Sequence, residues 1–128
     1  MKYKVYIEDS SESKPRPHEI AAVIKIAEIE RSDMVFMRRL QSKLPDLYFL
    51  KTNTRWELKS PLGGGKRTIQ NNLREASLHS ENVIIDLTRA RLTDAQGISR
   101  AREFMKSEKT RIKHLKILTK RKLIVDIK

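Results

Sequence analysis

The sequence has no cysteine and few aromatic residues. The first absence excludes several kinds of site, and the second limits which residues can build the core. Without cysteine, the chain cannot form disulfides, use thiol catalysis or bind zinc through thiolates. Aromatic residues make up only 5% of the 128 residues, so isoleucine, leucine and valine must supply most of a core. No apolar run approaches the roughly 20 residues that span a bilayer, and no signal peptide is visible. We therefore expect a cytoplasmic site of action, although the lack of cysteine also suits a module that is unfolded during delivery.

Two common site patterns are also missing. The three histidines, His18, His79 and His114, are far apart and form no H-x-x-H or H-E-x-x-H pattern, which argues against a histidine-rich zinc site. Residues 60–68 read SPLGGGKRT, but a P-loop needs glycine where Ser60 stands. We interpret these glycines as positions where the backbone turns or passes close to a ligand.

The sequence is rich in positive charge. It has 28 basic and 16 acidic residues, a net charge of +12. Residues 1–64 hold 12 basic and 9 acidic residues, whereas residues 65–128 hold 16 and 7. One strongly basic half is typical of a protein that binds a polyanion, above all nucleic acid. A membrane partner is not expected, because no segment combines a bulky apolar face with a basic one.

The hydrophobic pattern predicts an α/β fold with a mixed β-sheet flanked by helices. Helices are expected over residues 18–31, 66–79 and 94–106, and strands over residues 1–8, 33–39, 46–50, 54–60, 82–87, 112–119 and 122–128. The apolar run of residues 82–87, NVIIDL, indicates a buried central strand. The predicted order is α-β-β-β-α-β with an added α-β-β. Residues 1–17 are predicted to be a strand and polar linker, and residues 18–128 a single domain.

The segment LPDLYFLKTNTRWELK, residues 44–59, predicts a hairpin with one apolar face. Because strand side chains alternate between faces, the apolar set should point to the core. That set is Leu47, Phe49, Trp56 and Leu58. Asp46, Glu57 and Lys59 then share the opposite face. Either register that matches the apolar sides sets Asp46 beside Glu57 or Lys59.

Such a trio can support metal-assisted hydrolysis. The carboxylates of Asp46 and Glu57 and the carbonyl of Leu58 are hard oxygen donors suited to Mg²⁺, with Mn²⁺ or Zn²⁺ as other candidates. Lys59 could orient the attacking water. The alternative is a surface salt bridge between Lys59 and a cross-strand acid, worth about 0–1 kcal/mol.

The spacing of PD and ELK on successive strands resembles the PD-(D/E)XK nuclease superfamily, whose core has the same α-β-β-β-α-β order. A second resemblance covers about residues 17–128. The segments PHEIAAVIKIAE, LPDLYF, WELKSPLGGGKRTIQNNLREAS and NVIIDLTR are similar to toxin domains at the C-termini of contact-dependent growth inhibition proteins and related polymorphic toxins. Those domains are typically tRNA-cleaving nucleases paired with an immunity protein.

The resemblance implies a ribonuclease toxin domain. Together with the charge geometry of the hairpin, it leads us to predict a metal-dependent endoribonuclease that acts on tRNA. It implies catalytic roles for Asp46, Glu57 and Lys59, and adds Glu19 as a further acid on the first helix. It also implies a cognate immunity protein and delivery as part of a larger secreted toxin. The oligomeric state stays open.

Basic and polar residues around the second helix are candidates for binding the substrate. Lys66, Arg67 and Thr68 stand where this helix begins, and a helix N-terminus favours phosphate. Arg74 lies further along the same helix and could also contact phosphate. Asp86, at the end of the predicted buried strand, either closes that strand or lies near the catalytic acids.

Three other functions stay open. The first is a barnase-like ribonuclease toxin that needs no metal and attacks through the 2′-hydroxyl. The second is a DNA nuclease of the same fold. The third is a nucleic-acid-binding module without catalysis.

Overall fold

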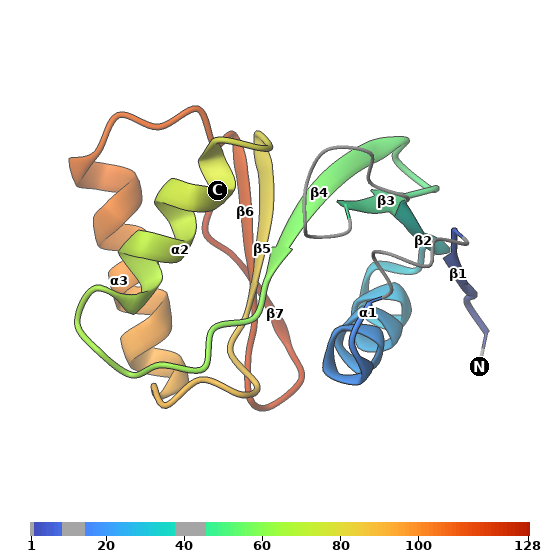
Figure 1. Cartoon of the computed structure of the whole chain (residues 1–128), viewed down its shortest axis with the longest axis horizontal. Helices are drawn as coiled ribbons and strands as arrows, with labels where there is room; N and C mark the ends of the chain where they lie inside the picture. Colours follow the sequence, from blue (N-terminus) through green and yellow to red (C-terminus); the bar gives the residue numbers. More distant parts are fainter. Residues whose placement is uncertain (1, 9–14, 38–45) are drawn as a thin grey trace. The chain divides into compact units, whose positions relative to one another are not determined.

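The computed structural model describes residues 2–8, 15–37 and 46–128, with the side chain of Asp46 left out (Figure 1). This part of the chain forms seven strands and three helices. In chain order these are β1 (Val5–Ile7), α1 (Pro17–Glu30), β2 (Met34–Met37), β3 (Asp46–Phe49), β4 (Thr54–Lys59), α2 (Thr68–Ser77), β5 (Asn82–Asp86), α3 (Asp94–Ser107), β6 (His114–Leu118) and β7 (Ile124–Asp126).

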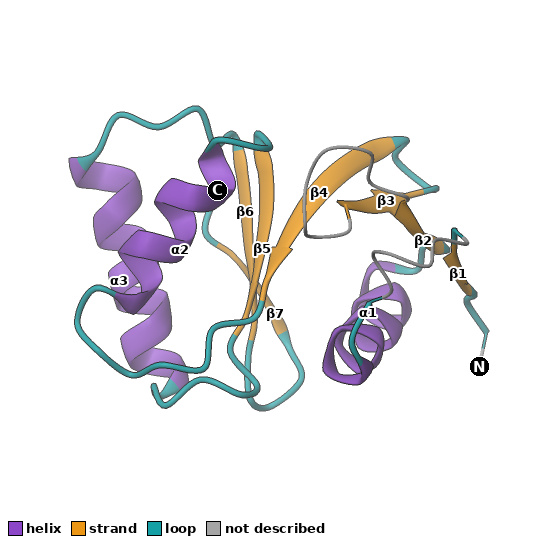
Figure 2. Cartoon of the chain, in the orientation of Figure 1, coloured by secondary structure: helices purple, strands orange, loops and turns teal. Residues whose placement is uncertain are grey.

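The observed elements confirm the predicted mixed α/β class and the predicted order (Figure 2). Most of the polar linker predicted before α1 lies outside the described residues, as do residues 38–39 of the predicted second strand. None of the described helices combines the length and the apolar character needed to span a membrane.

The chain divides into two compact units, Met1–Glu57 and Leu58–Lys128, and strand β4 runs through the division. Each unit contains one helix that connects two parallel strands. Helix α1 follows β1 and precedes its parallel neighbour β2, and α3 stands in the same way between β5 and β6. The division into units leaves the single domain over residues 18–128 as a prediction.

The first unit consists of α1 and a sheet of mixed direction. Strand β1 runs parallel to β2, β2 pairs with β3 antiparallel, and β3 pairs with β4 antiparallel. Pro17 opens α1, where a missing N–H costs nothing. The buried apolar residues include Val23, Ile26, Met34, Phe36, Leu47, Phe49 and Trp56. The rings of Phe49 and Trp56 stack across the hairpin with centroids 5.0 Å apart.

The second unit packs α2 and α3 against each other and α2 against β5. Its core draws on every element, and includes Ile69, Leu73, Val83, Ile85, Leu87, Phe104, Leu115 and Ile117. All residues from Val83 to Leu87 are fully buried, as predicted for this strand. Gly97 lets α3 approach the sheet, since a Cβ there would lie 2.5 Å from a Leu87 methyl group.

Helix α3 begins with a reciprocal cap. The Thr93 side chain accepts from the Gln96 N–H at 3.1 Å, and the Gln96 side chain accepts from the Thr93 N–H at 3.0 Å. Such a box satisfies two N–H groups that the helix leaves unpaired. Thr93 is therefore the residue that caps the start of α3.

Candidate catalytic strand and basic loops

The hairpin register agrees with one of the two predicted pairings. Leu47 lies opposite Trp56, and Tyr48 lies opposite Arg55. The same antiparallel register, continued by one residue, sets the backbone of Asp46 opposite Glu57. The Asp46 side chain lies outside the description, so its role stays a prediction.

The charged residues at the end of β4 are not ordinary surface charges. Glu57 is fully buried and Lys59 is only 6% exposed. Their apolar neighbours Trp56 and Leu58 are also buried, as predicted, so all four consecutive residues are shielded from solvent. Burying charge is costly unless other groups compensate for it. This strand end therefore differs from a typical exposed hairpin face.

Lys59 has a partner that the sequence pattern did not suggest. Its Nζ lies 3.0 Å from Oε1 of Glu75 on α2, and the Lys59 side chain is 7% exposed while that of Glu75 is 60% exposed. The hydrogen bond from Lys59, followed by its charge, holds the pKa of Glu75 below its ordinary value. The alternative of a cross-strand acid was therefore wrong about the partner, which comes from a helix.

Glu19 is tied to the start of its own helix. One carboxylate oxygen accepts from the Arg16 N–H at 2.8 Å, while the Glu19 N–H donates to the Arg16 carbonyl at 2.9 Å. The side chain is only 9% exposed. This contact gives Glu19 a capping role, and the catalytic role stays a prediction.

Asp86 connects the segment that follows β4 with the segment that follows β5. One carboxylate oxygen accepts from the N–H and the hydroxyl of Thr88, at 2.9 and 2.6 Å. The other accepts from the hydroxyl of Ser60 at 3.3 Å. Ser60 directly follows Lys59, so the fully buried Asp86 fixes the chain where the candidate lysine leaves β4.

The glycine-rich segment after β4 packs against the loop after β5. The Arg91 N–H donates to the carbonyls of Leu62 and Gly63, both at 3.2 Å. A Cβ on Gly64 would lie 2.3 Å from the Arg91 carbonyl oxygen, so only glycine fits there. The predicted close approach therefore occurs, but the neighbour is protein backbone.

Two long basic side chains hold these loops from outside. The Arg100 guanidinium donates to the Gly65 carbonyl at 3.2 Å. The Lys120 ammonium donates to the carbonyl of Leu87 at 3.0 Å and also to that of Ala90. Sequence reasoning missed both residues, because an arginine or lysine that binds a distant carbonyl leaves no local pattern.

The predicted phosphate ligands differ in how available they are. Lys66 and Arg67 are exposed, and Thr68 opens α2 with its N–H bonded to the Gly65 carbonyl at 3.2 Å. Arg74 instead forms a bidentate pair with Glu108, whose first bond joins Nε and Oε2 at 3.1 Å. This hydrogen-bonded pair raises the pKa of Arg74 and lowers that of Glu108. A phosphate at Arg74 would have to compete with that carboxylate.

The predicted metal ligands are of a chemical type that can bind Mg²⁺. Among the side chains that the structure describes, no three His, Asp or Glu residues lie close enough to hold a metal ion. The Asp46 carboxylate is not part of that set. The predicted donors, two carboxylates and the Leu58 carbonyl, are hard oxygens, which Mg²⁺ prefers. The buried position of Glu57 also fits, because a bound cation would compensate for its charge.

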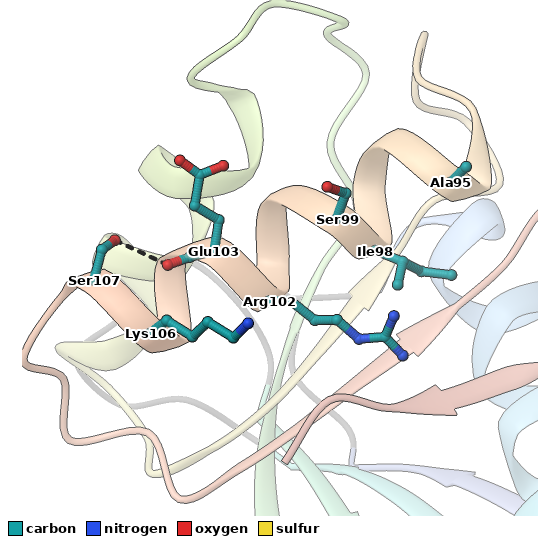
Figure 3. A pocket seen from close by; sticks show the side chains of 7 residues that line it. All are labelled: Ala95, Ile98, Ser99, Arg102, Glu103, Lys106 and Ser107. Atoms are coloured by element: carbon teal, nitrogen blue, oxygen red, sulfur yellow. Dashed lines mark hydrogen bonds between the residues drawn. The ribbon is translucent and has the colours of Figure 1, made fainter.

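A groove lies along one exposed face of α3 (Figure 3). Its lining consists of Ala95, Ile98, Ser99, Arg102, Glu103, Lys106 and Ser107. One hydrogen bond there joins the Ser107 hydroxyl to the Glu103 backbone carbonyl at 2.9 Å. None of the candidate catalytic residues contributes to this groove.

Comparison with known proteins gives one family and one fold. The family described as "Contact-dependent growth inhibition CdiA C-terminal domain" matches residues 43–124. Among solved structures, the chain is similar to "CdiA-CT/CdiI toxin and immunity complex from Burkholderia pseudomallei". The TM-score is 0.68 and the identity 13%, over 96% of this chain and 98% of the other, which shows a shared fold. A comparison with curated proteins found no match.

Proposed function

Because this chain belongs to the family of contact-dependent growth inhibition CdiA C-terminal domains, we propose that it is a metal-dependent endoribonuclease that cleaves tRNA. It is a toxin domain of a family that forms part of larger secreted toxins and whose members are generally nucleases. Beyond the family's general nuclease activity, we propose RNA as the substrate, a bound divalent metal, and specific catalytic and phosphate-binding residues. It also adds the PD-(D/E)XK class and a cytoplasmic site of action.

One observation carries the proposal. Strand β4 bears a fully buried glutamate and, two residues later, a nearly buried lysine. Residues two apart on a strand share a face. Burying charged side chains costs free energy, whereas a hydrolytic centre requires charged groups that are shielded from solvent. The backbone register, continued by one residue, sets Asp46 opposite Glu57, which supports Asp46 as the second acid of the proposed site.

The residues would divide the work as follows. Asp46, Glu57 and the Leu58 carbonyl would hold a divalent cation, and Glu19 would complete the shell. When bound, such a cation lowers the pKa of a water molecule that it holds and screens the negative charge of the phosphate. Lys59, held by Glu75, would orient the attacking water and stabilise negative charge on the phosphate. Lys66, Arg67 and Thr68 would bind neighbouring phosphates, with Arg74 as a further contact.

The test is a digestion of total tRNA and of plasmid DNA by the purified chain, with Mg²⁺ and with EDTA. We expect cleavage of tRNA only in the presence of metal, and products without 2′,3′-cyclic phosphate. Cleavage in EDTA that leaves cyclic phosphate would establish the metal-free ribonuclease instead. Preferential digestion of DNA would establish the DNA nuclease, and binding without turnover would establish the non-catalytic module.

A cognate immunity protein is the proposed protein partner. The solved structure with the same fold is described as a toxin and immunity complex. We expect the cognate immunity protein to form a stable complex with the chain and to suppress its cleavage of tRNA. Cleavage that continues in a saturated complex would contradict this role.

A further inference from the structure

Two loops of the second unit are fastened into one surface, which we call the two-loop platform. It consists of residues 61–67, before α2, and residues 87–93, after β5. Figure 1 shows both loops at the same end of this unit. The Arg91 N–H donates to two carbonyls of the first loop, and Gly64 permits the backbones to touch. The platform is therefore held together by the backbone itself.

Four cationic side chains of the platform are exposed. They are Lys66, Arg67, Arg89 and Arg91. Within residues 58–128, which the structure describes in full, no carboxylate pairs with any of these four. This contrasts with Arg100 and Lys120, whose cationic groups donate to platform carbonyls. The platform thus has cations that brace it and cations that face solvent.

The acids of this unit explain the contrast. Residues 58–128 contain seven acidic side chains. Six of them contact other residues: Glu75 with Lys59, Glu81 with Lys113, Asp86 with Ser60 and Thr88, Asp94 with the Lys120 N–H, Glu108 with Arg74, and Asp126 with Lys116. The seventh, Glu103, lies on the exposed face of α3. None of these seven acids therefore contacts any of the four platform cations.

We propose that Arg89 and Arg91 join Lys66 and Arg67 in binding the phosphate backbone of a nucleic acid. Exposed arginine forks match phosphate geometry, and rigid loops lose little entropy when they bind. A protein partner is less well matched, because interface cores are usually apolar or aromatic. Leu62 is the platform's one exposed large apolar side chain among the described residues. The inference deepens the proposed function, since RNA is the substrate named there.

The experiment measures binding without cleavage. The full chain is titrated with a fluorescent 2′-O-methylated RNA hairpin in EDTA, which blocks both metal-dependent hydrolysis and attack by the 2′-hydroxyl. Affinity is recorded over a series of NaCl concentrations for wild type and for the double variant Arg89→Ala, Arg91→Ala. We expect the salt slope of the double variant to fall by about 2, roughly one for each lost phosphate contact.

A matched control removes the same charge elsewhere. The double variant Arg102→Ala, Lys106→Ala lowers the net charge equally, but these residues line the groove on α3. Its salt slope should fall by less than half as much. Equal slopes for the two double variants would overturn the proposal, because general attraction would then explain binding. Thermal unfolding of both variants verifies that each is folded, and Arg89→Lys, Arg91→Lys should restore most of the slope.

Two further readouts separate this inference from the proposed function. Polyglutamate of matched charge should compete far less well than RNA, and equal competition would overturn the phosphate assignment. A chain that never cleaves tRNA but needs Arg89 and Arg91 to bind RNA would refute the nuclease and keep the platform. A chain that cleaves tRNA and binds normally without them would keep the nuclease and refute the platform.

Discussion

The two compact units of this chain differ in charge and in what their charged groups do. Residues 1–57 carry 11 basic and 9 acidic residues, while residues 58–128 carry 17 and 7. The carboxylates proposed for catalysis, on Glu19, Asp46 and Glu57, belong to the first unit. Every proposed phosphate contact belongs to the second. The comparison indicates that catalysis and anion binding can be disturbed separately.

A second difference concerns how each unit uses its acids. In the first unit, Glu19 is bonded to the backbone of its own helix and Glu57 is fully buried. In the second unit, four acids form ion pairs, and none of their partners is a platform cation. The four acids are Glu75, Glu81, Glu108 and Asp126. The overall charge of +12 therefore says less about binding than the positions of the acids do.

The largest expected effect separates catalysis from binding. Glu57→Gln keeps the shape of the side chain but removes its charge, so we expect cleavage of tRNA to fall at least about 100-fold. Binding of the 2′-O-methylated hairpin in EDTA should change less than about twofold, because the proposed contacts lie in the other unit. Gel assays of cleavage and fluorescence titrations measure the two effects. Glu103→Gln, on the exposed face of α3, is the matched control and should cleave normally.

Gly64→Ala should break the platform. A Cβ at this position would lie 2.3 Å from a backbone oxygen, so the loops must separate. Overpacking of this kind costs about 1–3 kcal/mol of unfolding free energy, which urea denaturation can measure. Gly65→Ala is the control, because its Cβ would lie 3.7 Å from the nearest side-chain atom. If both variants are equally stable and bind RNA equally, the close contact between Gly64 and Arg91 does not position the platform.

A smaller effect should appear at the lysine–glutamate pair that crosses from β4 to α2. Because Lys59 lowers the pKa of Glu75, the pair stabilises the fold above the ordinary pKa of a glutamate, 4.5. That contribution is lost as the pH falls from this value through the lowered pKa. Glu75→Gln should therefore destabilise the chain at pH 7, by about 1 kcal/mol or less since Glu75 is largely exposed.

The control is the same pair of proteins in acid. Wild type and Glu75→Gln should differ little once the pH is below the lowered pKa of Glu75. A difference that stayed constant from pH 7 into acid would show that the pair contributes nothing through its charge. The cleavage rate at pH 7 should also fall in Glu75→Gln if Lys59 is catalytic, because its ammonium loses its anchor.

The smallest expected effect tests whether Glu108 keeps Arg74 from binding phosphate. Glu108→Gln removes the charge that engages Arg74, so the guanidinium becomes available to phosphate. We expect affinity for the RNA hairpin to rise by less than about threefold, with a salt slope steeper by up to about 1. Glu81→Gln removes the same charge from a different ion pair, with Lys113, and serves as the control. Equal gains in the two variants would argue against a phosphate contact at Arg74.

Much of this fold could be predicted from alternation and helical spacing. The hairpin arms, the buried faces of Leu47 and Trp56, and the Thr93 cap all follow from local patterns. What could not be predicted comes from distant parts of the chain. Glu75 contacts Lys59 of β4, and Lys120 contacts two carbonyls of the loop after β5. No sequence period encodes such contacts between distant residues.

The candidate site was only partly predictable for the same reason. The pattern placed Glu57 and Lys59 on one face of a strand, but it could not tell that this face is shielded. Burial depends on what packs against a strand, which is a tertiary property. Gly64 is a similar case, because glycine predicts a close approach without identifying the neighbour.

The bond from Lys120 to the loop after β5 has a consequence for the order of synthesis. A ribosome makes the arginines of that loop about thirty residues before the lysine that holds them. A nascent or truncated chain that stops at Thr119 would carry the cations without their brace. The proposed RNA contacts of this loop would thus lack one of their supports until Lys120 has been translated.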